Sequence, residues 1–89
     1  MKAIVSVFAK DAKGIIAYIT AFLAEKDINI LDISQTLMQE YFTMIMLVDL
    51  SDCPLPFDEL AVQLKEKGEA RALAVNIQRQ DIFDAMHRI

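Results

Sequence analysis

Apolar and polar residues repeat with two different periods along this chain, and the changes of period divide it into elements. Residues Ala3–Ala9 form a β-branched, largely apolar run that is typical of a buried strand. Apolar residues then recur at positions 15, 19, 22 and 23, one face of an amphipathic helix. We therefore expect a helix from about Gly14 to Lys26, followed by a turn at Asp27–Asn29.

A hairpin follows, with a turn predicted at Gln39–Tyr41. Its first strand begins at Ile30 and alternates, which predicts one core face and one face that is solvated or meets a partner. The two faces are Leu31, Ile33 and Leu37 against Asp32, Ser34 and Thr36.

The second strand of the hairpin, Phe42–Leu50, is apolar on both faces. One face carries Phe42, Met44, Met46 and Val48, and the other carries Ile45 and Leu47. Helices on one side of a sheet cover only one of these faces. Either another part of the protein covers the second face, or it meets another subunit.

The rest of the chain predicts a helix, a strand and a short terminal helix. Pro56 is placed to begin the first helix, and Gly68 to end it as a left-handed cap. The strand has Leu73, Val75 and Ile77 on one face and Ala72, Ala74, Asn76 and Gln78 on the other. Gln80–Ile89 has the apolar spacing of a helix. The order is β-α-β-β-α-β with a terminal helix, which predicts one α+β domain over residues 1–89. We expect a ferredoxin-like, four-stranded antiparallel sheet with two helices on one face.

Composition and charge exclude several classes of protein. The net charge of −4 and the scattered Lys and Arg residues argue against nucleic-acid binding. The single cysteine, Cys53, excludes an internal disulfide and a multi-cysteine metal site. The chain begins with strand-like sequence and has no apolar run of the roughly 20 residues that span a bilayer. We therefore expect a cytoplasmic protein without a signal peptide, membrane segment or cofactor.

The loop from Lys10 to Ile15 is the first candidate binding site, because it joins the end of a strand to the start of a helix. Asp11 is a candidate N-cap, and Gly14 has no Cβ and lets another molecule approach the backbone. The free N–H groups of the first helical turn favour an anion such as a carboxylate. The alternative is a capped turn that binds nothing.

Two segments around this loop, Asp11–Ile16 and Ala24–Ile30, resemble the opening of ACT domains, small ligand-binding regulatory modules with the βαββαβ fold. Four further segments are similar to the stand-alone ACT proteins of bacteria and archaea, about ninety residues long. They are Met1–Val5, Asp32–Thr36, Tyr41–Met44 and Asp81–Ile89. The resemblance covers nearly the whole chain, and its terminal helix is the most specific part.

The resemblance implies that a small ligand, most often an amino acid, binds at a subunit interface. The residues implied in binding are Gly14 in the loop, flanked by Asp11 and Ile15, and Asn29, beside Ile30, at the start of the second strand. Many amino-acid-binding ACT domains have proline before the glycine, where this chain has Lys13. Asn29 is explained equally well as a turn residue.

The resemblance and the residues together predict a non-enzymatic homodimer or larger assembly that acts on a separate regulated protein. The alternative is a structural or interaction dimer that binds no ligand. An acylphosphatase-like enzyme ranks below both, because the loop has Lys10 and Lys13 where phosphate binding needs arginine. Cys53 and His87 lack the third group of a catalytic triad. A metal chaperone needs Cys-x-x-Cys, and an RNA-recognition domain needs aromatic residues on the central strands with a basic surface.

Overall fold

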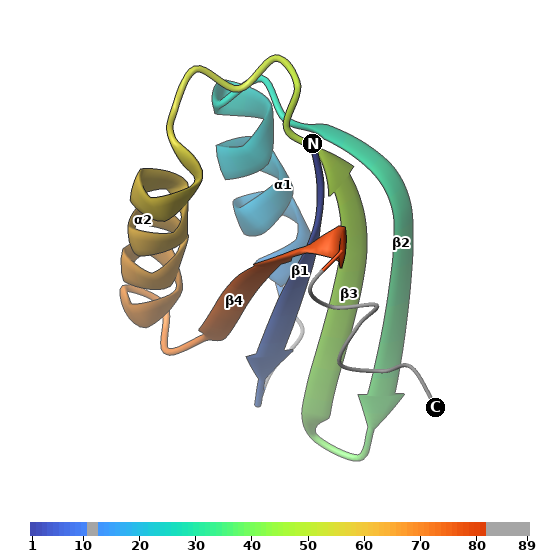
Figure 1. Ribbon diagram of the computed structural model, residues 1–89. Helices are drawn as coiled ribbons and strands as arrows, with labels where there is room; N and C mark the ends of the chain where they lie inside the picture. Colours follow the sequence, from blue (N-terminus) through green and yellow to red (C-terminus); the bar gives the residue numbers. More distant parts are fainter. Residues whose placement is uncertain (11–12, 82–89) are drawn as a thin grey trace.

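The computed structural model describes residues 1–10 and 13–81 of the chain, and six elements lie within them (Figure 1). The order is β1 (Lys2–Ala9), α1 (Ile15–Glu25), β2 (Asn29–Met38), β3 (Tyr41–Asp49), α2 (Phe57–Glu69) and β4 (Ala74–Arg79). This confirms the predicted β-α-β-β-α-β order. Apart from its first two positions, the helix predicted over Gln80–Ile89 lies outside the described residues.

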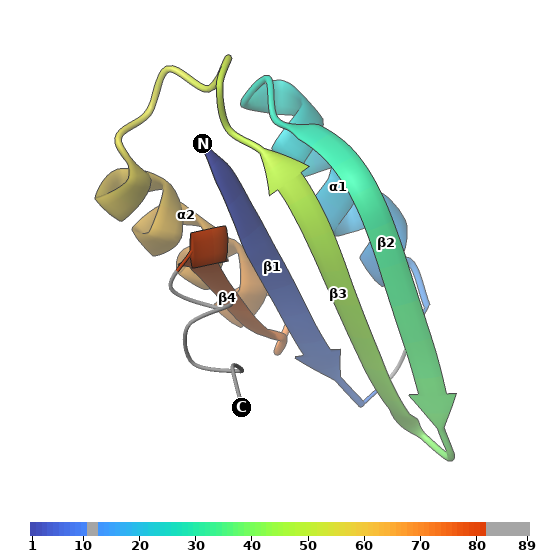
Figure 2. The same cartoon turned by 45° about the vertical axis from the view of Figure 1, so that its right-hand side comes forward.

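The four strands form one antiparallel sheet in the order β2-β3-β1-β4. Both helices cover the same face of this sheet, with α1 on the side of β2 and α2 on the side of β4 (Figure 2). The arrangement is the ferredoxin-like fold predicted from the sequence. It leaves β2 and β4 as edge strands, and within the described residues both helices lie on one face of the sheet.

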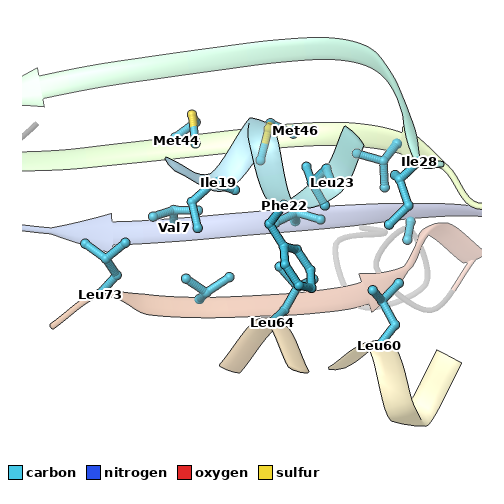
Figure 3. Close-up of a cluster of buried hydrophobic side chains, with 14 of the residues drawn as sticks. Val7, Ile19, Phe22, Leu23, Ile28, Met44, Met46, Leu60, Leu64 and Leu73 are labelled. Atoms are coloured by element: carbon cyan, nitrogen blue, oxygen red, sulfur yellow. The ribbon is translucent and has the colours of Figure 1, made fainter. Parts of the chain in front are cut away.

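The core lies between the helices and the sheet (Figure 3). All four apolar positions of the predicted α1 stripe are buried, as are all four on the inner face of β3. The outer face of the sheet is partly apolar, with Phe8 of β1 51% and Ile45 of β3 41% exposed. Ile45 and the half-buried Leu47 confirm the prediction that β3 is apolar on both faces. No part of the described chain buries the side chains of Phe8 and Ile45.

The prediction of a core face on the second strand is wrong for β2. Every side chain from Leu31 to Met38 is exposed, and only Ile30 is half-buried. The pairing register places Ile33 and Leu37 opposite the buried Met46 and Phe42, on the helix side. They are nevertheless 40% and 64% exposed, because β2 is an edge strand that the helix layer does not fully cover. A shift in the pairing between Ile30 and Asp32 also interrupts the regular alternation.

Gly68 does not end its helix, and the prediction of a left-handed cap there is wrong. Helix α2 continues to Glu69, and Gly68 lies buried inside its last turn. A Cβ at this position would lie 2.6 Å from Val75 Cγ2 and 2.9 Å from the Leu73 carbonyl oxygen. Glycine is required here because β4 packs directly on the helix backbone. The residue with positive φ is Ala72, at 58°, in the turn between α2 and β4.

Candidate functional site

The loop after β1 ends at Gly14, directly before the first residue of α1. Gly14 is the N-cap of the helix, in the left-handed region with φ 74°, and makes no side-chain capping bond. The prediction of Asp11 as N-cap is therefore wrong, and Asp11 itself lies outside the described residues. Because Tyr18 makes the first helical bond, to the Gly14 carbonyl oxygen at 3.0 Å, the N–H groups of residues 15–17 have no acceptor within the helix. Ile15 is buried beneath this turn.

A hollow of about 230 Å³ opens beside this turn and will be called the basic hollow. It lies between the end of β1, the first turn of α1 and the α2–β4 turn. Its lining residues are Ala9, Lys10, Lys13, Ile15, Tyr18, Arg71, Ala72 and Leu73. Three of them are cationic, and within the described part of the chain none is acidic.

Arg71 is a residue of this site that the sequence analysis missed. Its guanidinium carbon lies 4.6 Å from the centre of the Tyr18 ring. One guanidinium nitrogen, Nη2, lies 3.8 Å from where a Cβ on Gly14 would be. A stacked arginine of this kind presents its N–H groups at the edge of the plane, where a carboxylate or phosphate is bound. The loop after β1 holds no arginine of the kind that an acylphosphatase-like site needs, whereas the α2–β4 turn supplies Arg71.

Asn29 and Ile30 lie at the other end of the sheet. Asn29 pairs with Asp49, which pairs in turn with Lys2 at the start of β1. Gly14 follows the end of β1, and eight residues of strand separate the two ends by about 23 Å. Figure 1 shows the turn into β2 at the top of the sheet and the end of β1 at the bottom. The predicted site residues of one chain are therefore not brought together.

Asp49 is the last residue of β3 and pairs with Asn29. Its carboxylate accepts hydrogen bonds from the Ser51 hydroxyl at 2.6 Å and from the Ser51 backbone N–H at 3.0 Å. These bonds, the hydroxyl bond first, lower the pKa of Asp49 below its ordinary value. Because the pKa of Asp49 is lowered in the folded state, its ionised carboxylate stabilises the folded protein at neutral pH. This stabilisation is lost in acid, as the pH falls through the lowered pKa.

We expect Ser51→Ala to move the pKa of Asp49 back toward its ordinary value. The alanine removes the hydroxyl donor and keeps the backbone donor, so the return is partial. An NMR titration of the Asp49 side-chain carboxyl carbon in both proteins measures the change. An unchanged titration midpoint would contradict this role of the hydroxyl.

The described residues offer little to other kinds of site. They hold no group of three or more His, Cys, Asp or Glu side chains that could bind a metal ion. Cys53 is half-buried and packs against the core, and His87 lies outside the described residues. Neither helix in the described ranges has the length and apolar character needed to span a lipid bilayer.

The chain is similar to known proteins in both sequence and fold. A family model described as ACT domain matches residues 2–78. A UPF0237 protein of Clostridium acetobutylicum is 54% identical over 89 residues, the full length of both chains. The solved structure of an ACT domain protein from Streptococcus pneumoniae has a TM-score of 0.85 at 42% identity and covers 98% of each chain. A formyltetrahydrofolate deformylase from Pseudomonas putida shares the fold at a TM-score of 0.79 and 14% identity, over 91% of this chain and 30% of its own.

Proposed function

The chain belongs to the ACT domain family of regulatory, ligand-binding modules, and from this premise we propose that it binds an amino acid at a site shared by two copies of the chain. The ligand carboxylate meets the N–H groups at Gly14 and Ile15 of one copy. Asn29, beside Ile30, comes from the other copy and fixes the orientation of the ligand. The module is non-enzymatic and cytoplasmic, and it acts on a separate protein.

The observation that carries this proposal is the separation of Gly14 from Asn29. Because one chain holds them at opposite ends of the sheet, a site containing both needs a second chain. The edge strand β2 offers the means, since its ten residues expose a row of side chains and an unpaired backbone edge. Antiparallel pairing of two β2 strands about a two-fold axis sets the start of one beside the end of the other.

The register of the sheet determines which residues of the two copies this pairing brings to the same end. The end of β2 lies level with the end of β1, because Leu37 pairs with Phe42 and Phe42 pairs with Ala9. Asn29 of one copy therefore comes to the end of the sheet that carries Gly14 of the other. The exposed apolar side chains Ile33 and Leu37 become buried in the same step.

The exposed surface of α1 is also suited to a contact between two copies. Its exposed residues, in a stretch without any charge from Ile15 to Ala24, are Ile16, Ala17, Ala21 and Ala24. Small apolar side chains let two helices approach closely across a two-fold axis. In this dimer the two α1 helices contact each other, as the two β2 strands do. A ligand that binds to both chains stabilises the dimer.

Thermal unfolding against a panel of amino acids, with nucleotides and divalent metals as controls, tests the proposal. A ligand present at 100 times its dissociation constant stabilises the folded state by about 2.7 kcal/mol. We expect a concentration-dependent rise in Tm with one or a few amino acids. A flat response across the panel would favour the alternative, an interaction dimer that binds no ligand.

Replacing Gly14 by valine is expected to abolish binding of that amino acid and to leave the dimer folded. The left-handed backbone at φ 74° costs a residue with a Cβ about 1–2 kcal/mol. Among the described residues, Arg71 Nη2 at 3.8 Å is the nearest atom to the Cβ position, so they leave room for a side chain. Unfolding in urea measures the cost, and calorimetry measures the binding.

Gly14→Ala is the control, because it has the same strained backbone with a smaller side chain. We expect it to lose less stability than the valine variant, because alanine is not β-branched, and less of the affinity. If Gly14→Val binds the amino acid as the wild type does, the loop is not part of the binding site.

A further inference from the structure

We infer that the basic hollow is an oxyanion site, in which Arg71 binds a carboxylate or phosphate group of a small ligand and Tyr18 positions Arg71. The inference deepens the proposed function, because the hollow opens beside the loop that carries Gly14. It adds a charged partner from a different part of the chain to the backbone N–H groups of that loop. It also names the chemistry of the group that is bound.

Tyr18 fixes Arg71 from one side. The guanidinium carbon lies 4.6 Å from the ring centre, within the range of a cation–π stack. The ring is itself held at its far end, since the Tyr18 hydroxyl donates to the Lys67 carbonyl oxygen at 2.8 Å. The Tyr18 ring thus contacts one face of the guanidinium, and in the inferred site the edge of the guanidinium binds the ligand.

The α2–β4 turn fixes the backbone of Arg71. The carbonyl oxygen of Gly68 accepts two hydrogen bonds, from the N–H of Arg71 at 3.0 Å and from the N–H of Leu73 at 2.8 Å. Ala72 between them has φ 58°, the left-handed conformation that reverses the chain. The close packing of Gly68 on β4 therefore also determines where Arg71 emerges.

Among the residues that the structure describes, the charges that line the hollow favour an anion. Arg71, Lys10 and Lys13 all line it, although the protein as a whole carries a net charge of −4. No carboxylate of the described residues forms an ion pair with Arg71. Concentrating positive charge on an acidic protein raises the local concentration of anionic ligands.

The size of the hollow and the position of Arg71 suit a small organic ligand that carries an oxyanion group. Its volume of about 230 Å³ exceeds the roughly 30 Å³ that one water molecule occupies in the liquid, so a small organic ligand can enter. Arg71 Nη2 lies 3.8 Å from the Cβ position of Gly14. An oxyanion bound at the first turn of α1 therefore reaches the N–H groups of the helix and the guanidinium together.

The test is an NMR titration of the whole protein, labelled with nitrogen-15, at constant ionic strength. The probes are sodium phosphate and sodium acetate, with sodium chloride as the reference salt. The readouts are the Nε–H signal of Arg71 and the amide signals of Gly14 and Ile15. Phosphate against acetate distinguishes the two sources of the oxyanion.

The variants are Arg71→Met and the matched control Arg79→Met. Arg79 pairs with Asp81 at 2.8 Å and lies at the opposite end of the sheet, so its loss removes the same charge elsewhere. We expect saturable binding of at least one probe in the wild type and in Arg79→Met. Arg71→Met should weaken that binding at least about tenfold. Arg71→Lys keeps the charge without the planar fork and should fall between them.

The role of Tyr18 has its own readout. Tyr18→Phe keeps the stacked ring and loses the hydroxyl bond that holds it, and we expect it to weaken binding of the probe less than Tyr18→Leu does. Tyr18→Leu loses the ring, so the ring-current shift of the Arg71 Nε–H signal should disappear and binding should weaken. An unchanged Nε–H shift in Tyr18→Leu would refute the positioning role.

The outcomes separate this inference from the proposed function. If neither probe shifts the Arg71 and Gly14 signals, or if Arg71→Met binds as the wild type does, the inference is overturned. An amino acid that raises Tm equally in the wild type and in Arg71→Met would leave the proposed function standing and refute the role of Arg71. Binding of phosphate that depends on Arg71, without a Tm response to any amino acid, would support the inference and refute the proposed ligand class.

Discussion

Replacing Gly68 by valine is expected to unfold most of the protein at room temperature. The first added carbon already lies 2.6 Å from Val75 Cγ2 and 2.9 Å from the Leu73 carbonyl oxygen. Valine adds two further methyl groups in the same direction, and a backbone oxygen cannot rotate away from them. A domain of this size has roughly 4–13 kcal/mol of stability to lose. The loss of the cooperative transition in urea, followed by circular dichroism, measures the effect.

Gly68→Ala gives the graded version of the same experiment. We expect it to lower the free energy of unfolding by about 2–3 kcal/mol, the upper range for overpacking. Helix propensity alone would make the same change stabilising by about 1 kcal/mol, so the two accounts differ in sign. The exposed neighbour Glu69→Ala is the control and should be nearly neutral.

A double-mutant cycle assigns the clash to its partner. Val75→Ala removes the closest methyl group and leaves the Leu73 carbonyl oxygen in place. The combined variant should therefore be about 1 kcal/mol more stable than the sum of the single effects predicts. Additive effects would show that Val75 is not the obstacle.

Replacing Ile33 by glutamate is expected to dissociate the proposed dimer and to leave the monomer folded. Ile33 is 40% exposed on β2 and lies near the middle of that strand, where a two-fold axis brings the two copies together. Each dimer then receives two facing carboxylates in place of two buried apolar groups. We expect a loss of about 2–4 kcal/mol of association free energy. Sedimentation equilibrium measures the dissociation constant.

Val62→Glu is the matched control, since Val62 is 56% exposed on α2, away from the proposed interface. It should leave the dimer unchanged. Leu37→Glu, at a β2 position that is 64% exposed, costs the monomer less and should also weaken the dimer. Unchanged association in both β2 variants would exclude β2 pairing.

The sequence was sufficient to predict the order of the elements, because the two apolar periods report local structure. The helix stripe at Ile15, Ile19, Phe22 and Leu23 and the two-faced apolar pattern of β3 are both found. The burial of β2 could not be predicted from alternation. Its alternating residues are those of a half-buried strand, but the position at the sheet edge is a property of the whole topology.

The site was predicted less completely, for a similar reason. Gly14 stands out in the sequence because it lies between a strand and a helix, and the structure gives it a positive φ. Nothing local marks Arg71, which enters the site only because β4 pairs with β1. Gly68 shows how a local rule fails: glycine near a helix end is commonly a cap, and here a tertiary contact requires it instead.

Mixing two inactive variants tests the shared site most directly. Gly14→Val and Asn29→Ala are each unfolded, mixed in equal amounts, refolded and titrated by calorimetry with the amino acid that raises Tm most in the panel. The account predicts that neither variant binds alone, whereas the mixed dimer has one intact site, built from the Gly14 loop of one chain and Asn29 of the other. With random pairing, the mixture should recover about a quarter of the wild-type sites. No recovery in a mixture shown to contain mixed dimers would contradict a site shared between two chains.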